Sequence, residues 1–142
     1  RNSAFLEVMM RSIFTLSVAA ILVLSPPALV AHHSVNLFFD QGSVVEVEGT
    51  ISEIFWGSPH IGFVLLAGNA DGGEQWELES GAIRILDRRG IRRDSFGIGD
   101  RVRVAGWPDG KGGNAMFVTN VLLPDGDELQ MTARPQPLRW PH

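Results

Sequence analysis

The stretch 44–66, VVEVEGTISEIFWGSPHIGFVLL, constrains the fold most strongly because it predicts two β-strands joined by a bend. From Val44 onward, apolar residues alternate with polar ones at a period of two, which is typical of a strand with one face in water. Gly49 interrupts this strand, and a glycine there often marks the bulge or sharp bend that a small barrel requires. Pro59 cannot donate a ladder hydrogen bond, so it marks the bend, with His60 directly after it.

The elements after the first strand follow an order that indicates a fold. A glycine-rich loop over 67–73 separates the second strand from the third, and the helix is predicted from the spacing of Ile83 and Leu86, with Gly90 suited to its C-terminal end. The predicted elements are strands at 60–66 and 74–80, a helix at 82–89, and strands at 101–107 and 114–123. Three strands, a helix and two strands are the order of a five-stranded OB-fold-like barrel, mainly β, with one short helix between strands 3 and 4. A β-sandwich fragment or another small barrel is the competing architecture.

The N-terminal part of the chain has the features of an export signal. Residues 12–24 form an uncharged apolar run that follows Arg11 and leads into a proline-containing segment ending at Ala31. A positive start, a short apolar run and a small residue at the cut predict a secretory signal peptide, which would form the helix ahead of the barrel. A bilayer span needs roughly 20 apolar residues, so membrane contact is expected only before cleavage, and an uncleaved anchor is the alternative. The gene is expected to start at Met9 or Met10.

Cleavage near Ala31 would leave 111 residues in the bacterial periplasm or secreted further. Residues 32–142 carry 10 Lys and Arg against 15 Asp and Glu, a net charge of −5, which makes nucleic acid a poor partner. The chain has no cysteine, so it forms no disulfide even where the compartment would allow one. The expected organisation is upstream residues plus signal peptide at 1–31, an extended lead-in at 32–43, the barrel at 44–124, and a loosely held, polar, proline-containing tail at 125–142.

Six short motifs give the chain a family resemblance. They are HHS at 32–34, FD at 39–40, VEGTI at 47–51, WGSPH at 56–60, WELE at 76–79 and GDRVRVAG at 99–106. With these motifs, nearly all of residues 32–142 resembles DUF6152, a family of small secreted bacterial proteins of unknown function. The resemblance implies a small periplasmic β-barrel and supplies no activity. The family's bend usually carries Asn before Pro-His, whereas this chain has Ser58, which can still cap a turn.

Three histidines and one aspartate are the candidate metal ligands. Cleavage after Ala31 would give His32 a free α-amine beside its imidazole, and nitrogen donors of this kind suit Cu(II). His60 would supply a second imidazole if the lead-in lies beside the bend, and His33 or the carboxylate of Asp40 would complete the set. The alternative is that an N-terminal His-His binds copper weakly without any evolved purpose, and that His60 only hydrogen-bonds its loop.

The tryptophans are the candidates for a ligand-binding face. Barrels of this type bind ligands across strands 2 and 3 and the neighbouring loops, often by stacking on aromatic rings. Trp76 lies on the third predicted strand, and Trp56 and Trp107 lie at strand ends. The alternative is that at least two of the three fill the ends of the barrel.

No catalytic motif accompanies these candidates. The serines lack a nucleophile-elbow context, and the glycine-rich loops lack the Gly-Lys-Ser/Thr ending of a phosphate-binding loop. The glutamates on the predicted strands have the spacing of a solvated face. The arginines around the predicted helix are also expected to form a solvated face, and the alternative for these arginines is contact with anionic lipid or polysaccharide. The sequence therefore favours a non-catalytic binding or adaptor module in the periplasm, with an unknown ligand or protein partner. A copper-binding protein is the alternative.

Overall fold

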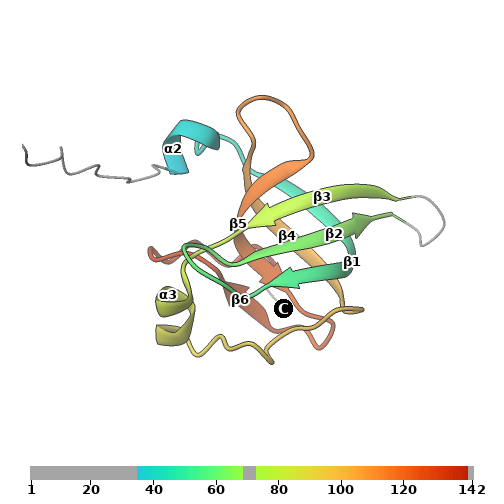
Figure 1. The fold of residues 1–142 in the computed structure, drawn as a ribbon, viewed down its shortest axis with the longest axis vertical. Helices are drawn as coiled ribbons and strands as arrows, with labels where there is room; N and C mark the ends of the chain where they lie inside the picture. The colour runs from blue at the N-terminus through green and yellow to red at the C-terminus, as the bar shows by residue number, and fades with distance from the viewer. Residues whose placement is uncertain (1–34, 69–72, 141–142) are drawn as a thin grey trace, which may run out of the picture. The chain divides into compact units, whose positions relative to one another are not determined.

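The structure is a computed structural model that describes residues 35–68 and 73–140. The predicted signal peptide, its cleavage site near Ala31, and the candidate ligands His32 and His33 lie outside these residues. The described elements are α2 (Val35–Phe38), β1 (Val45–Phe55), β2 (Gly62–Ala67), β3 (Glu74–Glu79), α3 (Ile83–Arg88), β4 (Arg101–Pro108), β5 (Ala115–Leu122) and β6 (Glu128–Gln130) (Figure 1). Among them, neither helix is long and apolar enough to cross a membrane.

A parallel pairing between β3 and β5 closes the sheet into a barrel. The strands follow one another in the order β3-β2-β1-β4-β5, joined by antiparallel pairings, and β3 then pairs in parallel with β5. This closing pairing joins Glu77, Leu78 and Glu79 to Ala115, Met116 and Phe117. With the helix between β3 and β4, the arrangement confirms the predicted five-stranded OB-fold-like barrel.

Strand β1 is the longest strand and belongs to both halves of the barrel. Its first half pairs with β4 and its second half pairs with β2, with a register shift between Ile51 and Glu53. Gly49 lies where the two pairings overlap, and a side chain there would collide with the carbonyl oxygen of Leu66 on β2. The glycine that the sequence placed at a bend is therefore required by the close approach of two strands.

The inward faces of the strands form the core. Val45, Val47 and Ile51 of β1 are partly or fully buried, whereas Glu46 and Glu48 are exposed, as the alternation predicted. The fully buried barrel residues include Ile51, Leu65, Val102, Val104, Val118 and Val121. Helix α3 adds Leu86, which has no exposed surface, and is followed after its C-cap, Arg89, by Gly90, whose positive φ of 75° suits glycine.

The described part of the lead-in, residues 35–43, is not extended throughout, contrary to the prediction. Residues 35–38 form one helical turn, α2, in which the Phe39 N–H donates to the Val35 carbonyl over 3.0 Å. Phe39 then forms a bridge to Asp109 and packs on Phe117, with ring centroids 5.7 Å apart. The local pattern of apolar residues could not reveal this turn because the contact that fixes it comes from the distant strand β5.

Residues 125–140 of the C-terminal tail are also not loosely held, contrary to the prediction. Strand β6 pairs with β5, and Met131 directly after it is fully buried in the barrel core. The Met131 carbonyl accepts the Gly81 N–H, and Arg139 donates to Glu46 on β1 over 3.1 Å. Strand β6 has only three residues and lies among polar and proline residues. Its pattern is too short to predict a strand from the sequence.

We expect Met131→Ala to destabilise the fold by about 2–5 kcal/mol, because it leaves a cavity in the core. Leu138→Ala is the matched control, since Leu138 lies in the same tail but is 62% exposed, and its effect should stay within about 0.5 kcal/mol. Urea unfolding measures both free energies. Equal, small effects of the two substitutions would mean that the tail does not dock on the barrel.

Candidate ligand-binding site

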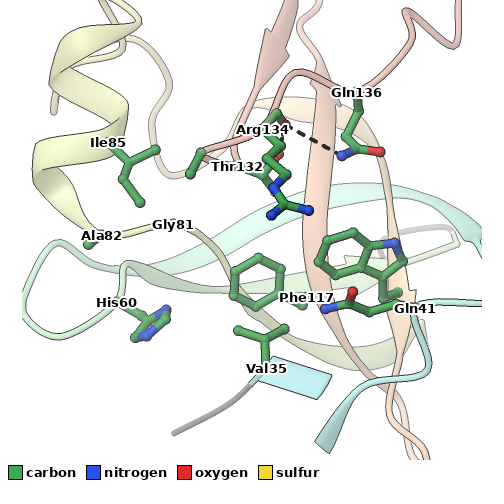
Figure 2. Close-up of a pocket in the computed structure, with 12 residues that line it drawn as sticks. Val35, Gln41, His60, Gly81, Ala82, Ile85, Phe117, Thr132, Arg134 and Gln136 are labelled. Atoms are coloured by element: carbon green, nitrogen blue, oxygen red, sulfur yellow. Dashed lines mark hydrogen bonds between the residues drawn. The ribbon is translucent and has the colours of Figure 1, made fainter. Parts of the chain in front are cut away.

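A pocket of about 630 Å³ opens between the barrel, α3 and the C-terminal segment. Its apolar walls come from Val35, Ala82, Ile85, Trp107 and Phe117. Its polar lining comes from Gln41, His60, Thr132, Arg134 and Gln136. Figure 2 draws these side chains and labels all of them except Trp107. This pocket is called the His60 pocket below.

His60 is held in one orientation by acceptors on a neighbouring strand end. Its Nδ1 lies 2.9 Å from the Ser80 carbonyl oxygen and 3.2 Å from Oε1 of Glu79. Both partners accept hydrogen bonds, so the ring carries its proton on Nδ1 and Nε2 keeps a lone pair when the imidazole is neutral. The imidazole also makes a T-shaped contact with the ring of Phe117, with centroids 6.0 Å apart and planes at 77°.

The bend before β2 places His60 at this position. The Ser58–Pro59 peptide bond is cis, and the chain then returns along the end of β3. Ile61 and Ser80 are joined by the Ser80 N–H, which donates to the Ile61 carbonyl over 2.9 Å. Ile61 and Ser80 are both fully buried, so the main chain on either side of the imidazole is anchored in the core.

Aromatic rings form the wall next to His60. Trp107 of β4 and Phe117 of β5 are stacked, with centroids 5.6 Å apart and planes at 13°. Of the three candidate tryptophans, Trp107 alone lines the His60 pocket. Trp56 packs on Phe96 and Trp76 packs against the barrel core, so the three indoles do not share one binding face here.

The four predicted metal ligands have different placements. His60 lines the pocket, whereas His32 and His33 lie outside the described residues. Asp40 does not line the pocket, and its carboxylate accepts the Ser43 hydroxyl over 2.6 Å and the Gly42 N–H over 3.0 Å. These two hydrogen bonds, the first more strongly, lower the pKa of Asp40. Within residues 35–68 and 73–140, no three His, Cys, Asp or Glu side chains gather in a way that could hold a metal ion.

One side of the pocket, which the C-terminal segment provides, was not predicted from the sequence. Thr132 donates its hydroxyl to the Arg134 carbonyl over 2.7 Å, and Gln136 donates to the same carbonyl over 3.4 Å. Figure 2 shows the Arg134 side chain directed into the pocket, on the other side of Phe117 from His60 in this view. No local pattern pointed to Arg134, because its place depends on the docking of β6 and Met131.

Comparison with known proteins gives a family and no function. A family model described as "Family of unknown function (DUF6152)" matches residues 20–118. No curated protein and no solved structure matches the chain.

We expect Ser43→Ala to raise the pKa of Asp40 toward its ordinary value, because the substitution removes the hydrogen bond that lowers it most. A pH titration followed by carboxyl ¹³C NMR measures this value, and Ser95→Ala is the control because the Ser95 hydroxyl accepts the Arg92 N–H instead. Since the folded pKa of Asp40 is the lowered one, its contribution to stability is present above the unfolded pKa. That contribution is lost as the pH falls through the folded value. An unchanged Asp40 pKa in Ser43→Ala would contradict the turn geometry.

Proposed function

The chain belongs to the DUF6152 family, and we propose that its barrel is a non-catalytic binding module that takes a small, largely apolar ligand or partner group in the His60 pocket. The pocket itself carries this proposal. Ligand pockets usually measure about 300–1,000 Å³ and combine apolar walls with a few fixed polar groups. The His60 pocket has this volume and this mixture, with the stacked Trp107 and Phe117 as its wall.

The fixed orientation of the polar groups supports binding in preference to catalysis. His60 uses Nδ1 on Ser80 and Glu79, so the neutral imidazole presents a single acceptor atom, Nε2. Of the described residues that line the pocket, only Thr132 has a hydroxyl group. This hydroxyl donates its hydrogen bond to the Arg134 carbonyl and not to His60. A nucleophile needs a base within hydrogen-bond reach, and this hydroxyl already has another partner.

The proposed place of action is the periplasm. The support comes from the sequence, in which an apolar run over 12–24 ends in a segment suited to signal peptidase at Ala31. The acidic composition of residues 32–142 favours a small molecule or a protein over nucleic acid as the partner.

The neutral fluorescent probe N-phenyl-1-naphthylamine tests the proposed binding. We expect the wild-type protein to bind it with a rise in fluorescence, and Ala133→Phe to weaken binding at least tenfold, because Ala133 is exposed and its new ring would fill the pocket. Lys111→Phe is the control, since Lys111 is exposed in the β4–β5 loop and does not line the pocket. Equal binding by wild type and Ala133→Phe would place the probe elsewhere and contradict the proposal.

Copper binding is the second candidate function, and the orientation of His60 favours it. Histidines that ligate metals commonly donate their other ring N–H to a carbonyl or carboxylate, as Nδ1 of His60 does. The remaining proposed ligands are His32, with its α-amine, and His33 or Asp40. The histidines at 32 and 33 lie outside the described residues.

Titration with Cu(II) separates a copper site from a simple N-terminal chelate. Exported protein should begin at His32 by intact mass and bind one Cu(II), and His60→Ala should weaken binding more than about tenfold, or about 1.4 kcal/mol. His142→Ala is the control for histidine removal. Copper affinity that does not respond to His60→Ala would reject the copper function.

A further inference from the structure

Among the described residues that line the His60 pocket, Arg134 carries the one formal charge when His60 is neutral, and that charge is positive. None of the described residues that line the pocket is Asp or Glu, whereas Arg134 directs its guanidinium into it (Figure 2). Within residues 35–68 and 73–140, no carboxylate pairs with this guanidinium, and its side-chain nitrogens have no hydrogen-bond partner. We infer that the pocket selects a small flat anion, an aromatic carboxylate whose acid group pairs with Arg134; this inference rests on the proposed binding function.

The other arginines of the barrel make the state of Arg134 informative. Arg101 and Arg103 both pair with Glu48, and Arg139 pairs with Glu46. Arg84, Arg88, Arg92 and Arg93 also lack an ion pair to any described residue and are exposed as Arg134 is, but none of these four lines the pocket. Arg134 combines an unpaired guanidinium with a position on the pocket wall, and a guanidinium presents a planar fork that matches a carboxylate.

The main chain prepares Arg134 for this role. Its carbonyl accepts hydrogen bonds from Thr132 and Gln136, and the neighbouring Ala133 carbonyl accepts one from Arg89 over 3.0 Å. These contacts fix the backbone on both sides of the side chain, so a ligand meets a guanidinium whose attachment point is already ordered. Less conformational entropy is then lost on binding.

The apolar wall determines the shape of the ligand. Trp107 and Phe117 lie nearly parallel, and Ile85 and Ala82 lie on the side of the pocket formed by α3 and its start. Aromatic rings pack well on such a surface in offset or edge-to-face geometry. A two-ring aromatic acid matches this wall and a volume of about 630 Å³.

His60 determines the direction in which the acid group points. With Nδ1 donating to Ser80, the Nε2 lone pair of the neutral ring faces away from this acceptor. A carboxylate oxygen beside that lone pair would place two acceptors together. The acid group therefore lies at Arg134, and the apolar end of the ligand lies toward His60.

The test compares 2-naphthoate with 2-naphthamide, which has nearly the same shape but no charge, as competitors of N-phenyl-1-naphthylamine. In the wild-type protein, 2-naphthoate should bind at least tenfold more tightly than 2-naphthamide. Arg134→Gln should reduce this preference to less than twofold, while Arg88→Gln should keep it. Arg134→Lys should retain part of it, because the charge remains without the planar fork. Circular dichroism confirms that each variant is folded.

The outcomes separate the inference from the function on which it rests. If the wild-type protein binds the probe, and 2-naphthoate and 2-naphthamide compete with it equally well, the selection for an anion is rejected and the binding function stands. If Arg134→Gln keeps the full preference, another group provides the positive charge and the assignment to Arg134 is rejected. If the folded wild-type protein binds neither the probe nor either competitor, the proposed function fails together with the inference.

Discussion

The parallel pairing of β3 with β5 is the constraint on which the site depends. It aligns Glu79 with Phe117 and so brings the end of one strand beside the aromatic wall. Ser80 follows Glu79 directly, and its carbonyl holds Nδ1 of His60. The antiparallel pairing of β2 with β3 brings this acceptor to His60. If the barrel did not close at the seam between β3 and β5, the imidazole would lack the ring of Phe117 against which it packs.

The pocket is then completed by segments that lie outside the five-stranded barrel. The helical turn α2 contributes Val35, and the chain after β6 contributes Thr132, Arg134 and Gln136. Met131 connects this second wall to the fold, because its buried side chain anchors the segment in the barrel core. The polar groups of the pocket are thus positioned by core packing, which explains why a small domain without disulfides can hold an ordered pocket.

The sequence predicted the barrel well because its signals are local. The alternation around Gly49 and the proline at the bend determine strands and turns over a few residues, and the structure places both as expected. His60 was identified for the same reason, since a histidine beside a proline bend is visible in the sequence. Arg134 was not, because its role depends on the docking of Met131, far from His60 in the chain. The grouping of Trp56, Trp76 and Trp107 as one face rested on ring type and on their places at or near strand ends, and only the fold distinguishes the two indoles that pack against the core.

The proposed ligand site is the pocket between the aromatic wall and the C-terminal segment, and not the outer strand face that barrels of this type commonly use. Nuclear Overhauser effects between bound 2-naphthoate and protein side chains distinguish these two locations. Contacts from the naphthyl protons to Phe117 and Ile85 are expected. Contacts to Phe55 and Leu66, which are exposed on β1 and β2, would contradict it and place the ligand on the outer face of the strands.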